Sequence, residues 1–165
     1  MVTLTTLEEM HIFKDFNSDQ LNKILELCIL ETFQQDQMLF TEGEAAQDMW
    51  IVIDGRVELR FEMPNANATT KDNMISTHHN EIQESQVFGW SCFIPPYKMR
   101  LSAYCASRRC QVIKINAEKL NKLMGSDTDI GFKIMGYIVH VLGYRFKQMQ
   151  EEVVKFLGIN MMNSW

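Results

Sequence analysis

The stretch from residue 48 to residue 61 constrains the fold of this chain more than any other. Apolar residues fill positions 49–53, and positions 56–61 alternate between charged and apolar side chains. Asp54-Gly55 stands between the two halves and is a strong signal for a two-residue hairpin turn. The pattern predicts two antiparallel strands, and on the second strand the core-facing side is expected to comprise Val57, Leu59 and Phe61.

Further strand and turn signals continue along the chain. Short apolar runs predict strands at 38–40, 100–106 and 110–115, and Glu42-Gly43-Glu44 is typical of a turn. The segment 64–80 is polar and has no core pattern, so we expect it to be a long hairpin loop. The middle of the chain is therefore expected to be antiparallel β-structure.

Helical signals lie at both ends. Ser18 is a favourable N-cap, and the apolar residues after it recur at helical spacing up to Cys28. Asn116 is expected to cap a short helix that Gly125 ends. A longer helix is expected after it, reaching about Lys155, with an apolar side that comprises Ile130, Ile134, Ile138, Val141 and Tyr144.

Strands flanked by helices define the predicted fold class. We expect an α+β domain centred on an antiparallel β-roll of the double-stranded β-helix or jelly-roll type, with N-terminal helices and a long C-terminal helix. The 165 residues suffice for one domain, expected at 1–155, followed by a short tail at 156–165. The last helix is longer than its own core needs, which favours a homodimer through that helix over a helix packed only on its own sheet.

Composition and charge weigh against several functions. A net charge of −5 argues against a dominant nucleic-acid surface. No apolar run is long enough to span a membrane, and the N-terminus lacks a signal-peptide pattern, so a cytoplasmic location is expected. The four cysteines form no Cys-x-x-Cys pair and are expected to be free thiols rather than metal ligands. Because no activated nucleophile or acid/base pair emerges, an enzyme is the least expected class.

A functional signal comes from the segment Val87-Phe88-Gly89-Trp90-Ser91. Its Phe-Gly turn and the strand-like residues after it resemble the phosphate-binding cassette of the cyclic-nucleotide-binding domains. The order of other signals agrees, from Gly43 through 48–59 to 110–116, and the resemblance covers roughly Ile12 to Glu152. It implies a β-roll that senses a small ligand, similar to the sensor domain of bacterial catabolite-activator-type regulators.

Two charged positions of that cassette differ in this chain. Family members have a carboxylate after the Phe-Gly pair and an arginine at the start of the next strand, where this sequence has Trp90 and Met99. Each lost charge-assisted contact typically costs about 1.5–3 kcal/mol, so weakened cyclic-nucleotide binding is expected. Arg100 is one position later and would reach a phosphate only through a bulge or a shifted register. The candidate ligand-binding residues are Phe88, Gly89, Trp90, Ser91, Met99, Arg100, Leu101 and Ser102.

Three functions are compatible with these signals. The favoured one is a non-catalytic regulatory module that binds cAMP, cGMP or a divergent substitute in the roll and transmits this through the C-terminal helix. The second is the sensor part of a transcription regulator without its own DNA-binding domain, because too few residues follow Lys155 to build one. The third is an interaction or adaptor protein that has lost the ligand. Trp90 bears on this choice, since an indole can either cap a pocket or fill a core.

Overall fold

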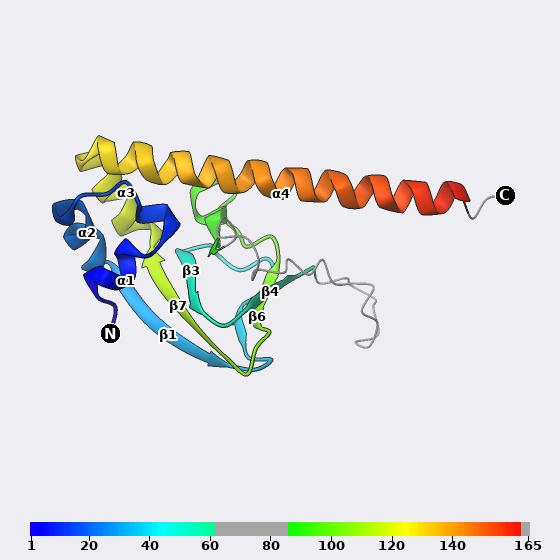
Figure 1. The fold of residues 1–165 in the computed structure, drawn as a ribbon, viewed down its shortest axis with the longest axis horizontal. Helices are drawn as coiled ribbons and strands as arrows, with labels where there is room; N and C mark the ends of the chain where they lie inside the picture. Colours follow the sequence, from blue (N-terminus) through cyan, green and yellow to red (C-terminus); the bar gives the residue numbers. More distant parts are fainter. Residues whose placement is uncertain (62–85, 163–165) are drawn as a thin grey trace.

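The described part of the chain forms a roll of two antiparallel sheets with helices gathered along one side (Figure 1). The structure is a computed structural model that describes residues 1–61 and 86–162. The strands are β1 (Cys28–Gln34), β2 (Met38–Phe40), β3 (Asp48–Asp54), β4 (Val57–Arg60), β5 (Val87–Phe88), β6 (Ser102–Cys105) and β7 (Arg109–Asn116). The helices are α1 (Leu4–Glu8), η1 (His11–Phe13), α2 (Ser18–Leu25), η4 (Trp90–Phe93), α3 (Ala117–Ser126) and α4 (Thr128–Met162). The predicted α+β roll with flanking helices is confirmed.

The strands divide into one sheet with the order β1-β7-β3-β5 and another with the order β2-β6-β4. β7 pairs with β1 over the whole length of β1, with Phe33 opposite Cys110. Cys28 opens β1 opposite Ile115, so the prediction that it lies on the apolar face of the preceding helix is wrong. Helix α2 ends at Leu25 with Glu26 as its C-cap, and the ladder to β7 begins at Cys28.

The Asp54-Gly55 turn does not close a hairpin, because β3 and β4 belong to different sheets. Gly55 has φ +79°, and a Cβ on it would collide with the carbonyl oxygen of Arg109 and with Ser107 Oγ. The turn therefore leads the chain from one sheet to the other, close against the connection between β6 and β7. Local chemistry predicted the turn correctly, but contacts remote in sequence decide where it leads.

The apolar side of β4 is shorter than predicted. Val57 and Leu59 are buried, whereas Phe61 lies beyond the end of the strand and is exposed. The loop expected at 64–80 lies outside the described residues.

Aromatic side chains fill the roll between the two sheets. Trp50 of β3 lies opposite Phe88 of β5, and their rings stack with centroids 6.0 Å apart and 26° between the planes. Phe40 of β2 contacts both rings at centroid distances of 5.7 and 5.9 Å and so joins the sheets. Such ring pairs contribute roughly 0.5–1.5 kcal/mol each beyond the apolar area that they bury.

Helix α2 is capped by Asn17, one residue before the predicted cap. The Asn17 side chain accepts the Gln20 N–H at 2.9 Å, and the Gln20 side chain accepts the Asn17 N–H at 3.3 Å. This reciprocal capping box makes Ser18 the first helical residue, so the prediction of Ser18 as N-cap is wrong. A capping box needs a glutamine or glutamate three residues after the cap, and that residue follows Asn17 rather than Ser18.

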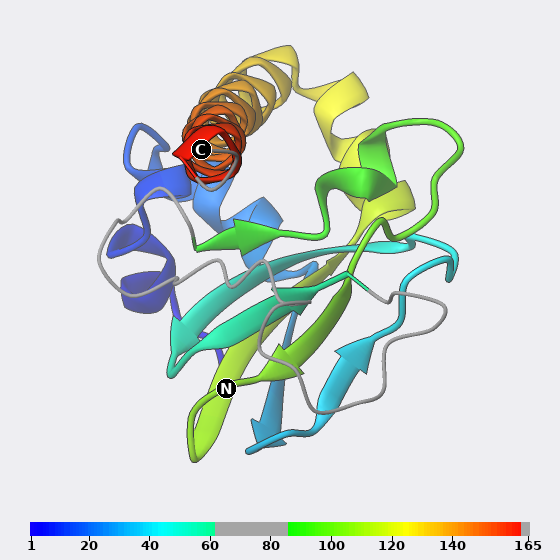
Figure 2. The same cartoon turned by 90° about the vertical axis from the view of Figure 1, so that its right-hand side faces the viewer.

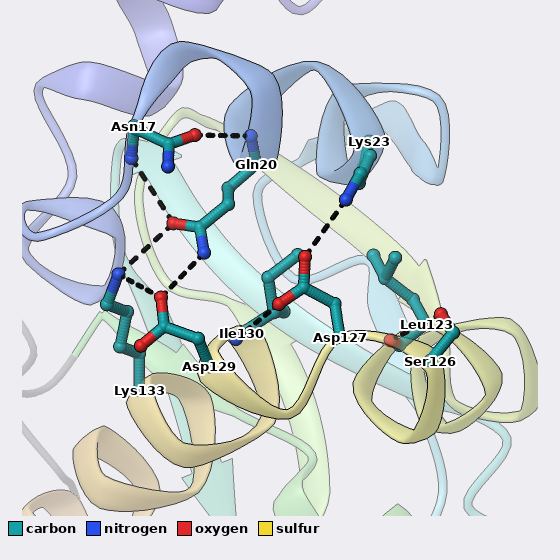
Figure 3. A network of polar contacts seen from close by, with 9 residues as sticks. All are labelled: Asn17, Gln20, Lys23, Leu123, Ser126, Asp127, Asp129, Ile130 and Lys133. Carbon is teal, nitrogen blue, oxygen red and sulfur yellow. Dashed lines mark hydrogen bonds and ion pairs between the residues drawn. The ribbon is translucent and has the colours of Figure 1, made fainter.

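A polar network joins α2 to the beginning of α4 (Figure 3). Gln20 is buried, and its side-chain nitrogen donates to Asp129 Oδ2 at 2.7 Å. Lys133 Nζ donates to the same carboxylate at 2.6 Å and to Gln20 Oε1 at 3.1 Å. Lys23 pairs with Asp127 at 2.9 Å. These charge-assisted contacts tie the N-terminal helices to the start of the long helix.

Helix α4 covers the roll with its first half and projects beyond it with its second half (Figure 1). Ile130, Ile134, Ile138 and Val141 are buried against the domain, as their spacing predicts. Viewed nearly along its axis, α4 lies over one side of the roll (Figure 2). The helix continues to Met162, past the expected end near Lys155. Within the described residues, no helix combines the length and the apolar character needed to cross a bilayer.

The turn between β5 and η4 requires a glycine. Gly89 has φ +72°, in the left-handed region. A Cβ on it would lie 2.5 Å from Trp50 Cδ1 and 3.0 Å from the carbonyl oxygen of Asp48. Both distances are shorter than van der Waals contact, so the turn and the indole are packed without space for a side chain.

We expect Gly89→Ala to lower the free energy of unfolding by about 2–4 kcal/mol, because alanine adds both left-handed strain and an overlap with Trp50. Urea unfolding followed by circular dichroism measures the change. Gly125→Ala is the control, since a Cβ there meets no atom within 4 Å and alanine favours a helix. Equal stabilities of the two variants would contradict the packing argument.

The network at the start of α4 predicts a pH dependence of stability. Lys23 first, and then the Ile130 N–H, lower the pKa of Asp127 below its ordinary value. A carboxylate whose pKa is lowered by folding stabilises the fold above its unfolded pKa of about 3.9, and this contribution is lost as the pH falls through the folded value. Asp127→Asn is therefore expected to destabilise the protein at neutral pH and to differ less in stability from the wild type at about pH 3.

Chemical unfolding of both proteins across this pH range measures the difference. Asp36→Asn is the matched control, because Asp36 is exposed and makes no ion pair within the described residues. A difference in unfolding free energy between Asp127→Asn and the wild type that stays constant with pH would show that the carboxylate charge does not stabilise the contact.

Candidate ligand-binding site

The candidate site is built on the turn that follows β5. Phe88 is fully buried and stacks on Trp50, so its side chain anchors the turn to the core. Gly89 then turns the chain into η4, in which Ser91 is buried. Trp90 is partly buried and packs against the core cluster. The first four predicted site residues thus form one compact turn whose side chains mostly face inward.

The segment between η4 and β6 forms the second half of the site and is fastened to the turn between β2 and β3. The Met99 N–H donates to the Glu44 carbonyl, and the Met99 carbonyl accepts the Gly43 N–H, both at 2.8 Å. Ser102 is fully buried, and its Oγ accepts the Glu42 N–H at 2.9 Å. Ser102 therefore already holds a backbone amide of the neighbouring turn with its hydroxyl.

Met99 and Arg100 differ sharply in their surroundings. Met99 is 5% exposed and belongs to the core, whereas Arg100 is exposed. Leu101 is partly buried against the core. The chain bends at residues 100 and 101, and β6 begins only at Ser102, two residues later than the predicted strand. The one charged side chain among the eight predicted residues is thus on the solvent side.

Arg145 of α4, which the sequence pattern did not single out, lies against this turn. Its Nη2 donates to the Val87 carbonyl at 3.5 Å, and its Nε is buried with no hydrogen-bond partner in the described part of the chain. Burial lowers the pKa of the Arg145 guanidinium to about 10, which keeps it charged at neutral pH. The sequence carries a signal for this placement, because Arg145 follows Ile138 and Val141 at the same helical spacing.

The cysteines take no part in this chemistry. Burial raises the pKa of the Cys28, Cys92 and Cys110 thiols to about 12, so they are protonated at neutral pH. All four cysteines are free. Within residues 1–61 and 86–162, no three His, Cys, Asp or Glu side chains are grouped so that they could hold a metal ion.

Several solved structures have a similar fold. The sensor domain of the transcriptional regulator DNR from Pseudomonas aeruginosa matches with a TM-score of 0.59 and 16% identity, over 87% of this chain and 88% of that one. A protein of Geobacter metallireducens GS-15, assigned as cyclic nucleotide-binding, matches with a TM-score of 0.69 and 20% identity, over 88% and 99%. The regulatory domain of Toxoplasma gondii PKA, solved with cAMP, has a TM-score of 0.59 and 17% identity, over 81% of this chain and 48% of that one. At these identities the likeness establishes the fold alone.

The family follows from the sequence itself. No curated protein sequence matches the chain. The family model for the cyclic nucleotide-binding domain, however, matches residues 30–127, from within β1 to just after α3. The matched residues are more than half of the chain and include the turn at Gly89 and the segment up to Ser102. The chain therefore belongs to the cyclic nucleotide-binding domain family.

Proposed function

We propose that this protein is a non-catalytic regulatory module. It binds a small anionic ligand, either cAMP, cGMP or a divergent substitute, beside the Phe88-Gly89 turn, and it passes the binding event to helix α4. The observation that carries the proposal is the contact between this turn and α4. Arg145 reaches the Val87 carbonyl directly, and Val141 is buried one helical turn before it.

This contact makes the turn and the helix mechanically dependent on each other. β5 is only two residues long and pairs with β3, while its outer carbonyl meets α4. A ligand that shifts the Gly89 turn must therefore change the packing of α4 or be opposed by it. A ligand moves such a two-state element only by binding one arrangement better than the other, which is how a regulatory domain works.

Two residues of the candidate site bear on the identity of the ligand. Trp90 and Met99 replace the carboxylate and the arginine that the family resemblance leads one to expect, and both pack into the core. An indole and a thioether supply neither a charged acceptor nor a cation. These two side chains also support the alternative, an interaction or adaptor protein whose roll is filled by its own residues.

A homodimer is the second part of the proposal. Exposed apolar side chains form a stripe along α4 that we call the dimer stripe, with members three, four or seven residues apart. The dimer stripe consists of Phe132, Met135, Val139, Phe146, Met149 and Val153. Phe132 is 81% exposed and Val139 64%. Partly buried Leu142 lies between Val139 and Phe146 at the same spacing.

The spacing of the dimer stripe supports a second copy of α4 as its partner. Apolar residues that alternate three and four apart average 3.5 residues, the repeat with which two helices pair as a coiled coil. The stripe continues onto the half of the helix that projects beyond the roll (Figure 1), away from the other described helices and strands. A continuous exposed apolar surface of this kind requires a partner.

The ligand is tested by restoring the missing carboxylate. We expect Trp90→Glu to bind cAMP or cGMP about tenfold more tightly than Trp90→Gln, because a carboxylate accepts from a ribose hydroxyl more strongly than an amide does. Isothermal titration calorimetry with both nucleotides, on both variants and the wild type, measures this. If no protein of the three binds either nucleotide, the ligand is neither cAMP nor cGMP, which leaves a divergent substitute or the adaptor alternative.

The dimer is tested by placing charges in the dimer stripe. The double variant Val139→Glu, Phe146→Glu is expected to raise the dimer dissociation constant at least about a hundredfold, because two apolar contacts are lost and like charges meet. Lys147→Glu, an exposed change outside the stripe, is the control and should leave it within about threefold. Sedimentation velocity measures both, and a wild type that remains monomeric at about 100 µM refutes the dimer.

A further inference from the structure

Three buried side-chain polar atoms within the described residues have no hydrogen-bond partner, and all three border the same short segment. They are Trp50 Nε1, Gln86 Oε1 and Arg145 Nε. Gln86 directly precedes β5, the guanidinium of Arg145 contacts Val87, and Trp50 stacks on Phe88. Buried polar groups are nearly always paired, so such a concentration in one place calls for an explanation.

Arg145 is the most costly of the three, because it carries a charge. Within the described residues, its one hydrogen bond, to the Val87 carbonyl, is long at 3.5 Å, and most of its five guanidinium N–H groups have no protein partner there. Burial and the neighbouring Tyr144 shift the pKa of Arg145, and no carboxylate of the described residues contributes. A partly buried cation without an anionic partner is disfavoured unless something compensates it.

Other partly buried cations of the domain are compensated. Lys114 pairs with Glu31 and Asp48 at 3.6 and 3.5 Å. Arg60 pairs with Glu58 at 2.9 Å. Arg145 therefore differs from them in lacking an acidic partner among the described residues rather than in being partly buried. It contacts Val87, just before the turn on which the candidate site is built.

We propose that Arg145 is the ligand's anion anchor, a cation supplied by helix α4 in place of the one that is missing at Met99. The proposal rests on the proposed function and specifies how its site binds charge. The guanidinium contacts the carbonyl of Val87, two residues before the Gly89 turn. A guanidinium binds phosphate oxygens through two parallel N–H donors, and it gains most where water is excluded.

Moving the anchor from a strand to α4 changes how binding is transmitted. An anion held by a cassette arginine acts on the helix through intervening residues. An anion held by Arg145 contacts α4 itself, so that occupancy of the site and the position of the helix are linked by one side chain. A ligand shifts the position of α4 only if it contacts the two positions differently, and a contact through Arg145 supplies that difference.

The experiment compares Arg145→Met, which keeps an unbranched side chain without the charge, with Arg145→Lys and with Arg108→Met as the matched control, because Arg108 is exposed and lies outside the candidate site. The probes are inorganic phosphate and cAMP, added to the full chain, with thermal unfolding and calorimetry as readouts. We expect phosphate to raise the unfolding temperature of the wild type and of Arg108→Met but not of Arg145→Met. Any cAMP affinity should fall about 10- to 100-fold in Arg145→Met and less in Arg145→Lys.

The unliganded proteins separate this role from a structural one. If Arg145 is an anchor, Arg145→Met should be at least as stable as the wild type without anions, because an uncompensated buried charge has been removed. A less stable Arg145→Met with an undiminished response to phosphate would show a structural role and overturn the inference. So would a wild type that responds to neither probe.

The two proposals fail separately. If cAMP binds the wild type and Arg145→Met equally, the anchor is wrong while the proposed function stands. If phosphate binds through Arg145 and neither cyclic nucleotide binds, the anchor stands and the ligand is an anion of another class. Should Arg145→Met fail to fold, the comparison of Arg145→Lys with Arg108→Met decides, since an anchor predicts weaker phosphate binding in the first variant only.

Discussion

The stacking of Trp50 on Phe88 is the interaction on which the rest of this structure depends. It joins β3 to the two-residue strand β5, which is too short to be held by its backbone ladder alone. Phe40 extends the stack to the other sheet, so one aromatic cluster closes the roll. The same indole fills the space beneath Gly89, which is why the turn tolerates only glycine. Core and candidate site are therefore one packing unit, and a change at the turn also alters the packing of the core.

This unit explains how the site can lose its usual charges and keep its shape. The backbone of the turn is held by aromatic packing and by the hydrogen bonds of Met99, none of which needs a charged side chain. The identities of residues 90 and 99 are then free to change without loss of the fold. The packing of the core maintains the shape of the site in this family member. The charge of the site comes from whichever element reaches the turn, and here that element is α4.

Helix α4 consequently has two faces and a fixed first turn with separate tasks. One face of isoleucines and Val141 seals the core, and Arg145 continues that face to the turn. The dimer stripe occupies another face and extends past the roll. The first turn of α4 is fixed to α2 through Asp129 and Gln20. Because the helix is fixed at one end and contacts the turn in its middle, small changes at the turn would be enlarged along its projecting half.

The sequence by itself determined the fold class, the strand and helix periods and the position of the Gly89 turn, because these depend on neighbours within a few residues. It did not determine that Asp54-Gly55 joins two sheets or that Cys28 opens a strand, because both depend on the residues of β7 and the turn before it, which are remote in sequence. The Asn17 cap is encoded locally, because Gln20 follows Asn17 at the spacing of a capping box. That Arg145 meets Val87 was decided by tertiary structure alone, since only the packing of α4 on the roll brings residues 58 positions apart to within one hydrogen bond.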